Sequence, residues 1–305
     1  MTTGWVALVR SAGLAASVVV LGTLAAHADG MDAPKGKAAA AEPPKPDYTI
    51  AYNVGASSNY VFRGISQSDQ GAAVQGGIDF TYKWLYLGVW SSSIDFGQTC
   101  GPVFNKSCAS DELDVYGGFK FPVHKTWNLD VGVITYNYPH SHDTPLVNAA
   151  GATVGVAKWD YYEGKVNLSG NITEPWTAGV TAFYSPKYTG GTGKVWTFEG
   201  TTAYTLPKWH QIEPSLSATL GYQAGNSSIQ YLAAIANGSS DYLYWNAGIT
   251  FTLDKLALDL RYWDTNINSG TTAFSPTGNY CDGTGFNKAS FQCGAQFSAT
   301  VKYTF

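Results

Sequence analysis

The sequence predicts an all-β protein, a transmembrane antiparallel up-and-down β-barrel of about twelve strands. Apolar and polar residues alternate with a period of two in a dozen segments, short turns alternate with long loops along the chain, and tryptophans gather beside the short turns. A period of two is typical of a strand whose two faces meet different surroundings. Short turns at one end and long loops at the other are typical of outer-membrane barrels, in which the short turns face the periplasm.

The alternation is clearest in three segments, 73–82, 113–121 and 255–263. In the first of them, Val74, Ile78 and Phe80 occupy one face while polar residues occupy the other. We expect the remaining strands near 48–61, 84–95, 126–138, 159–170, 175–185, 194–206, 211–223, 241–253 and 293–305. An even number of strands places both ends of the sheet on the periplasmic side, where a closed barrel needs them.

The connections between these strands fall into two classes. The expected short turns are 83–84, 122–125, 173–175, 206–210 and 254–255. The expected long loops are 63–71, 97–110, 139–158, 186–193, 224–240 and 265–292. Sandwiches and lipocalins also have two-faced strands, so the period alone does not separate them from a membrane barrel. The loop lengths, the tryptophans and the aromatic end of the last strand favour the membrane barrel. Its sheet must be closed, because open sheet edges cannot cross lipid.

Four tryptophans lie at or beside the short turns, and Phe305 ends the last strand at the same level. The predicted membrane-interface aromatics are Trp84, Trp127, Trp176, Trp209 and Phe305. Such a ring of aromatic side chains is typical of the girdle at a membrane interface. A terminal aromatic residue on an alternating strand also resembles the signal by which outer-membrane barrels are recognised. The barrel assembly machinery and outer-membrane lipid are therefore expected partners.

The first 28 residues have the pattern of a secretory signal, with Arg10, a short apolar run and the small residues of the sequence AHA before a cleavage site after Ala28. The apolar run is too short to span a bilayer as a helix. Residues 29–47 are rich in Ala, Pro and Lys and have no period, which predicts a disordered periplasmic linker. Residues 48–305 form the predicted barrel. The expected location is the outer membrane of a Gram-negative bacterium.

Composition excludes several other classes of function. The net charge is −4 with 13% charged residues and no basic block, so nucleic acid is not an expected partner. No phosphate-binding loop or dinucleotide fingerprint occurs, and we expect no cofactor. The sequence PHSHD at 139–143 begins a long loop, and two histidines and one aspartate so placed are weak evidence for a metal. His124 and His210 lie at short turns, so no strand carries the Ser–His pair of a barrel hydrolase, and we expect no enzyme.

The stretch 52–97 contains the pieces SNYVFRGISQSD, GAAVQGGIDF and LYLGVWSSSIDF. It resembles the N-terminal part of the TorF-family porins, and a weaker similarity extends through ELDVYGGF to the last strand, over most of 48–305. The resemblance implies an outer-membrane pore without implying a substrate. The cysteine-containing loops have no counterpart in the family pattern.

Alternate residues of each strand face the lumen, and this alternation, here called parity, places one set of charged residues inside the barrel. The predicted pore-lining residues are Asp79, Asp114, Lys120, Asp130, Glu163, Lys165, Glu199, Glu213, Asp259, Arg261 and Lys302. Acids outnumber bases in this set, and charges that line a pore set its selectivity, so one interpretation is a weak cation preference. The alternative is that these groups pair with one another and fill the lumen. The pairs Asp259 with Arg261 and Glu163 with Lys165, two residues apart on one face, are consistent with it.

Aromatic residues share the inward parity. They are Tyr86, Trp90, Tyr116, Tyr136, Tyr161, Tyr242, Tyr244 and Trp263. They either stack on a passing solute or, as we favour, pack a narrow lumen, since twelve strands enclose a bore between the filled eight-stranded barrel and the open large porins. Arg63, beside Gly64 at the rim of the first long loop, either guards the pore mouth or shapes a tight turn.

The four cysteines suit an oxidising compartment. Their spacings predict two local disulfides, Cys100–Cys108 and Cys281–Cys293, each closing an exposed loop. Taken together, the sequence predicts a passive pore for small polar solutes or ions with a weak cation preference. The alternative is a structural or adhesive barrel with an occluded lumen whose long loops contact partners outside.

Overall fold

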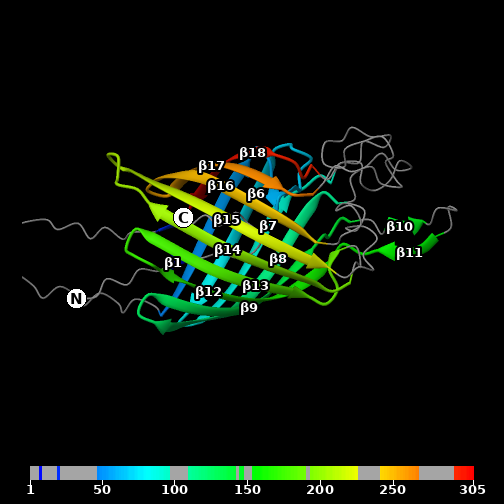
Figure 1. The fold of residues 1–305 in the computed structure, drawn as a ribbon, viewed down its shortest axis with the longest axis horizontal. Coiled ribbons are helices and arrows are strands. Elements are labelled where there is room, and N and C mark those ends of the chain that lie inside the picture. The colour runs from blue at the N-terminus through cyan, green and yellow to red at the C-terminus, as the bar shows by residue number, and fades with distance from the viewer. Residues whose placement is uncertain are drawn as a thin grey trace, which may run out of the picture.

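Twelve strands form one closed antiparallel barrel in the computed structural model, which describes residues 7–8, 19–20, 47–96, 109–141, 144–147, 153–189, 193–225, 241–267 and 292–305 (Figure 1). The barrel strands are β3 (Tyr48–Ser57), β6 (Ala73–Tyr82), β7 (Leu85–Ser93), β8 (Asp111–His124), β9 (Trp127–Asn137), β12 (Tyr161–Asn171), β13 (Trp176–Ser185), β14 (Val195–Thr205), β15 (Ile212–Gly225), β16 (Tyr242–Leu253), β17 (Leu256–Thr265) and β18 (Gln296–Thr304). Each pairs with the barrel strands before and after it along the chain.

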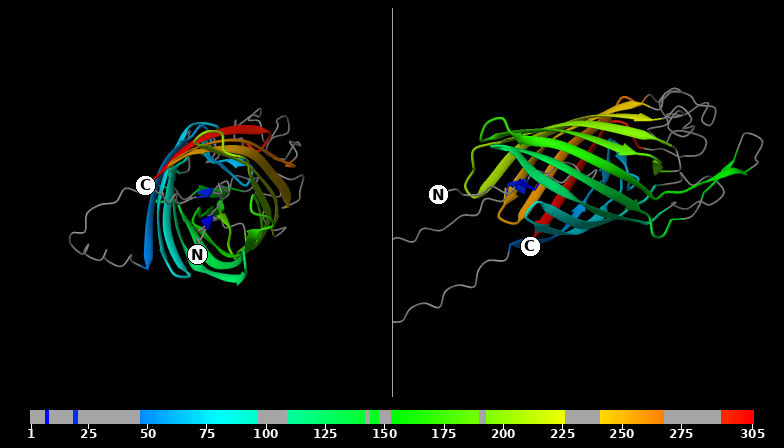
Figure 2. Two further views of the ribbon diagram at one scale, coloured as in Figure 1. Left: turned by 90° about the vertical axis from the view of Figure 1, so that its left-hand side faces the viewer. Right: turned by 90° about the horizontal axis from the view of Figure 1, so that it is seen from below.

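The last strand closes the barrel against the first. In this pairing Val301 of β18 lies opposite Ala56 of β3, and the Phe305 N–H donates a hydrogen bond of 2.9 Å to the Tyr52 carbonyl. Closure leaves no row of unpaired backbone groups along a sheet edge, which is the condition for strands to cross lipid. Figure 2 shows the barrel along its axis and from the side.

The predicted fold class is confirmed, and so are all twelve strands. Their ends differ from the expected ones by a few residues. The largest difference is at the first strand, which was expected to run to residue 61 and ends at Ser57, because the chain there leaves the barrel wall. β8 runs to His124, so the turn to β9 is shorter than expected.

Three pairs of short strands lie outside the barrel sheet. β4 (Val61–Phe62) and β5 (Ile65–Ser66) form a hairpin in the first long connection, and β10 (Thr144–Val147) pairs with β11 (Thr153–Ala157) in a hairpin that extends beyond the barrel (Figure 1). β1 (Ala7–Leu8) pairs with β2 (Val19–Val20). Among the described residues, no helix is long and apolar enough to cross a membrane.

The outer face of the barrel is apolar. On β3, Ile50, Tyr52 and Val54 are exposed, whereas Asn53 and Ser57 between and beyond them point inward. The other strands repeat this arrangement, so that large apolar side chains are exposed on the whole wall. Such a continuous apolar surface is stable against lipid and not against water.

Aromatic side chains mark both ends of this apolar wall. Trp84, Trp176, Trp209 and Phe305 are exposed at the end with the short turns, and Trp127 at the same end is half-buried. The opposite end carries a second exposed set that the sequence analysis did not anticipate. It comprises Tyr162, Trp196, Tyr222 and Phe297. Two aromatic bands with an apolar wall between them match the two interfaces of a bilayer.

Candidate functional site in the barrel lumen

The first long connection turns into the barrel instead of lying outside it. Residues 58–72, here called the inward hairpin, contain β4, β5 and a tip at Arg63 and Gly64. Both tip residues have positive φ angles, 49° and 81°, a conformation that suits glycine and that costs free energy at an arginine. Arg63 is only 2% exposed. The expectation that Arg63 lies at the rim of a loop is therefore corrected: it shapes a tight turn, and that turn lies in the lumen.

Arg63 reaches across the lumen to the wall formed by β12, which β7, β8 and β9 separate from β6. Its Nη1 and Nη2 donate hydrogen bonds of 2.8 and 2.7 Å to the two carboxylate oxygens of Glu163, which is 0% exposed. The guanidinium carbon lies 4.8 Å from the ring centre of Phe62 and 4.9 Å from that of Phe183. Burial alone lowers the pKa of Arg63, but the Glu163 carboxylate raises it more, so the pKa stands well above its usual value and the guanidinium stays charged.

The base of the inward hairpin is tied to the neighbouring part of the barrel by neutral hydrogen bonds. Asn59 donates from Nδ2 to Gln296 Oε1 at 2.7 Å and accepts from the Ser66 hydroxyl at 2.7 Å. The Gln67 N–H donates to the Tyr60 carbonyl at 2.7 Å, and the Asp95 N–H donates to the Gln67 carbonyl at 2.8 Å. These bonds hold the base against β18 and the segment after β7.

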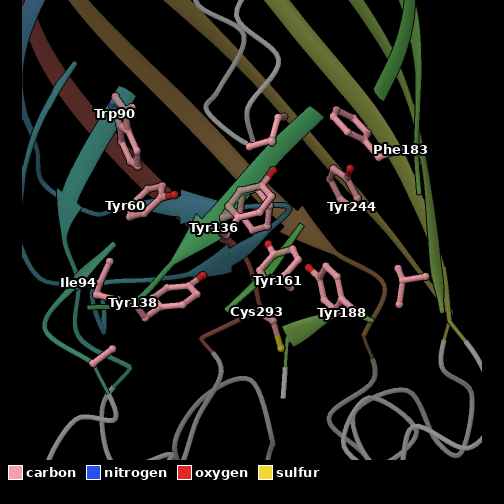
Figure 3. Packing of buried hydrophobic residues seen from close by; sticks show 14 of the residues in the cluster. Tyr60, Trp90, Ile94, Tyr136, Tyr138, Tyr161, Phe183, Tyr188, Tyr244 and Cys293 are labelled. Carbon is pink, nitrogen blue, oxygen red and sulfur yellow. The ribbon is translucent and has the colours of Figure 1, made fainter. Parts of the chain in front are cut away.

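Aromatic rings surround the inward hairpin and fill the half of the lumen nearer the long loops (Figure 3). Tyr60 packs edge-on against Trp90, with 5.4 Å between ring centres, and Phe62 lies 5.8 Å from Tyr136. Tyr136 in turn stacks on Tyr161 at 4.4 Å. Inward-facing aromatic side chains in this half thus pack on one another and on the hairpin.

The wall of β9 and β12 carries a buried ion pair. Lys165 Nζ donates a 2.8 Å hydrogen bond to Asp130 Oδ2, and the Tyr86 hydroxyl donates one of 2.8 Å to Asp130 Oδ1. Lys120 lies half-buried on the neighbouring strand β8. Lys165 and Asp130 therefore neutralise each other across the adjacent strands β12 and β9.

Asp259 and Arg261 of β17 form another buried ion pair, with neutral partners on β16. Arg261 donates from Nε and Nη2 to both carboxylate oxygens of Asp259, at 3.0 and 2.8 Å, and from Nη1 to Asn246 at 2.7 Å. The Thr250 hydroxyl donates to Asp259 at 2.6 Å. Asp259 and Arg261 are paired as their spacing suggested, whereas Glu163 binds Arg63 and not Lys165.

The other predicted lumen residues have different surroundings. Glu199 accepts a 2.6 Å hydrogen bond from the Tyr244 hydroxyl, and Asp79 accepts one from the Tyr116 hydroxyl. Glu213 forms an ion pair with Lys208 at a short turn. Lys302 is half-buried on the inner face of β18.

Glu112, which was not among the predicted pore-lining residues, precedes Asp114 by two residues and shares its inward face on β8. Both residues are 2% exposed, and Glu112 Oε2 and Asp114 Oδ1 have no hydrogen-bond partner. The Tyr60 hydroxyl of the inward hairpin lies 3.4 Å from Glu112 Oε1. Burial, and then these two carboxylates, raise the pKa of Tyr60 well above its usual value, so the hydroxyl remains a donor. The parity that identified Asp114 also applies to Glu112.

A cavity of about 80 Å³ lies beside the inward hairpin, with room for a few water molecules. Its walls combine amides and hydroxyls with charged and aromatic residues, among them Asn53, Gln75, Asp259, Lys302 and Trp263. The inner face of the barrel below the hairpin is therefore polar.

The remaining predicted sites lie mostly outside the lumen or outside the described residues. His142 and Asp143 are not described, and His140 pairs at 2.6 Å with Asp111 on the exposed surface. Within the described ranges no group of three metal-ligating side chains occurs. Cys100, Cys108 and Cys281 lie outside the described residues, whereas Cys293 is fully buried and is not a free thiol. The two disulfide pairings remain predictions.

A closed antiparallel barrel with an apolar outer face and a polar inner face defines the class of outer-membrane β-barrel proteins. The chain belongs to the family described as bacterial protein of unknown function (Gcw_chp), whose profile matches residues 40–305. No curated protein matches the sequence. The more specific resemblance to TorF-family porins remains a prediction.

Three solved structures are similar to this chain at low identity. The NanC porin has a TM-score of 0.48 and 10% identity, over 84% of this chain and 99% of that chain. The KdgM porin in complex with disordered oligogalacturonate has a TM-score of 0.46 and 10% identity, over 84% and 98%. LpxR from Salmonella typhimurium has a TM-score of 0.42 and 9% identity, over 84% and 99%.

Proposed function

We propose that this protein is an outer-membrane pore through which small polar solutes or ions diffuse passively. The observation that carries the proposal is the opposite polarity of the two barrel faces. Lipid-facing side chains are apolar, while amides, hydroxyls and charged groups line the inner face from β3 to β18. Polar inner faces of this kind line the water-filled channels of porins.

We further propose a weak cation preference. Lys165 with Asp130 and Arg261 with Asp259 are neutral as pairs and contribute little net charge. Glu199 and Asp79 accept hydrogen bonds from the hydroxyls of Tyr244 and Tyr116, which are neutral donors. Such acidic groups on a pore wall favour cations.

Three features of the chain's biogenesis complete the proposal. They are the export signal at 1–28 with the linker 29–47, recognition of the last strand by the barrel assembly machinery, and the two loop disulfides. The exposed ring of Phe305 beside β18 supports the second of these. An apolar side chain at the membrane rim is accessible to a partner that handles the unfolded barrel.

The inward hairpin favours a second candidate, a structural or adhesive barrel whose lumen stays occluded. Its aromatic packing fills the half of the lumen nearer the long loops. In that case the long loops, and not the lumen, carry the function. The two candidates differ in one property, the passage of ions.

Single-channel recording in planar bilayers with a KCl gradient separates the candidates. Current steps of stable size with a cation-biased reversal potential support the pore and its selectivity. Steps without this bias retain the pore and contradict the cation preference. Folded protein, verified by heat-modifiable gel migration, that gives no steps contradicts the pore and favours the occluded barrel.

A further inference from the structure

We propose that the inward hairpin is a gate and that the ion pair between Arg63 and Glu163 is its latch. This inference rests on the proposed pore function and adds its regulation. The hairpin is a separate element, since β4 and β5 pair with each other and not with the barrel sheet. It therefore has a position that can change while all twelve barrel strands keep their hydrogen bonds.

The two ends of the hairpin are attached differently. The base is held by several neutral hydrogen bonds, including Asn59 to Gln296 and the Ser66 N–H to the Gln292 carbonyl at 3.2 Å. At the tip, the charged contact with the far wall is Arg63 to Glu163. Neutral hydrogen bonds hold the base, whereas the tip adds a buried ion pair to its neutral contacts, so the base can act as a hinge and the ion pair as a latch.

Electrostatics makes this latch depend on both partners. A buried guanidinium without its carboxylate is strongly unfavourable, because its charge is removed from water without compensation. Arg63 Nε already has no partner, so Glu163 carries most of that compensation. When the hairpin leaves its position, water enters and both charges become hydrated. Loss of Glu163 therefore shifts the equilibrium toward the released hairpin.

Side chains of the barrel strands bind the tip of the hairpin. The Tyr136 hydroxyl donates to Glu163 at 3.1 Å and fixes the carboxylate, while the Phe183 ring forms one side of the guanidinium position. The Tyr242 hydroxyl donates to the Arg63 carbonyl at 3.3 Å, and on the near wall Gln296 Nε2 donates to the Gly64 carbonyl at 3.0 Å. These groups belong to barrel strands, so they keep their positions when the hairpin moves. The tip can therefore bind them again, and closure is reversible.

Open probability in planar bilayers tests the latch, with four proteins compared. They are the wild type, Glu163→Gln, the charge exchange Arg63→Glu with Glu163→Arg, and Asp111→Asn as control. Asp111 is an outward-facing carboxylate on β8 that pairs with exposed His140, so its amide variant changes a charge at the same end without touching the lumen. Heat-modifiable migration verifies that each variant is folded.

We expect Glu163→Gln to raise the open probability roughly tenfold or more. The charge exchange should return it toward the wild type, and Asp111→Asn should leave it unchanged. Equal open probability in the wild type and Glu163→Gln overturns the latch and leaves the pore intact. Silence of all folded variants overturns the pore itself, and the gate with it. Should Glu163→Gln not fold, Gly64→Ala tests the gate with both charges present, and an unchanged open probability in that variant likewise overturns the gate.

Discussion

The two terminal guanidinium nitrogens of Arg63 lie 2.8 and 2.7 Å from the two carboxylate oxygens of Glu163, a residue 100 positions later in the chain. This bidentate contact joins a hairpin in the first long connection to a strand on the far side of the barrel. It explains why a connection between neighbouring strands fills the lumen instead of facing the medium outside. The proposed gate depends on this pair.

Lysine should not replace arginine in the latch. In Arg63→Lys the charge is retained, but an ammonium group cannot bridge both carboxylate oxygens in one plane or lie flat between two rings. We expect an open probability between those of the wild type and Glu163→Gln, measured in planar bilayers. Wild-type behaviour of the lysine variant would mean that charge alone, without bidentate geometry, holds the hairpin.

Gly64→Ala should displace the tip sterically. An added Cβ would lie 2.3 Å from Thr265 Cγ2 and 3.0 Å from Tyr244 Cβ, and the φ of 81° at this position is strained for alanine. We expect a higher open probability without a change of lumen charge. Gly200→Ala is the matched control, because its Cβ would come no closer than 4.0 Å to the Leu220 carbonyl oxygen. Equal effects of the two variants would contradict a specific role for the tip.

Asp114→Asn should stabilise the folded barrel. Asp114 and Glu112 are two buried acidic side chains on one strand face, each with an oxygen that has no hydrogen-bond partner. Removal of one acid relieves their repulsion and should raise the free energy of unfolding in urea by about 1 kcal/mol. Asp259→Asn is the opposite case, since it leaves Arg261 buried without its carboxylate and should cost roughly 3 kcal/mol. A loss of stability in Asp114→Asn would show that the acid pair is compensated.

Glu199→Gln should reduce the cation preference of the open channel. Its carboxylate accepts a hydrogen bond from Tyr244, so the substitution removes a charge from the pore wall while the amide oxygen still accepts that bond. We expect the reversal potential in a KCl gradient to move toward zero, most clearly in the Glu163→Gln background. An unchanged reversal potential would show that Glu199 does not contribute to selectivity.

Phe305→Ala should impair assembly in cells more than folding in vitro. The Phe305 ring is exposed and packs edge-on against Tyr303 at 5.0 Å, whereas its backbone N–H donates to the Tyr52 carbonyl at the end of the β18–β3 pairing. The alanine variant keeps that backbone bond. We expect less folded barrel in cell membranes and normal folding into detergent micelles, both measured by heat-modifiable migration. Equal loss in both systems would indicate a purely structural role.

The barrel could be predicted because the apolar and polar residues of each strand reflect what its two faces contact. Alternation in segments such as 73–82 reflects lipid on one side and lumen on the other, and this information is local. The same parity placed Asp130, Lys165 and Arg261 on the inner face. The same alternation places Glu112, two residues before Asp114, on the inner face, so this residue could have been predicted as well.

The inward hairpin could not be predicted in the same way. The sequence RGISQSDQG has the composition of any exposed turn, with glycine, serine and aspartate. Its position depends on partners far away in sequence, Glu163 on β12 and Gln296 on β18, and no local pattern reports such contacts. Parity likewise suggested that Glu163 pairs with Lys165, because the arginine that takes this carboxylate comes from outside the sheet.

Replacement of residues 59–70 by a short glycine–serine link tests most directly whether the hairpin closes an otherwise polar pore. Recorded in planar bilayers beside the wild type, the folded replacement variant should give a steady open current with larger steps than the wild type, since the hairpin and its half of the aromatic packing are gone. A folded replacement variant that passes no current would contradict the account, because a barrel freed of its hairpin would then still be closed.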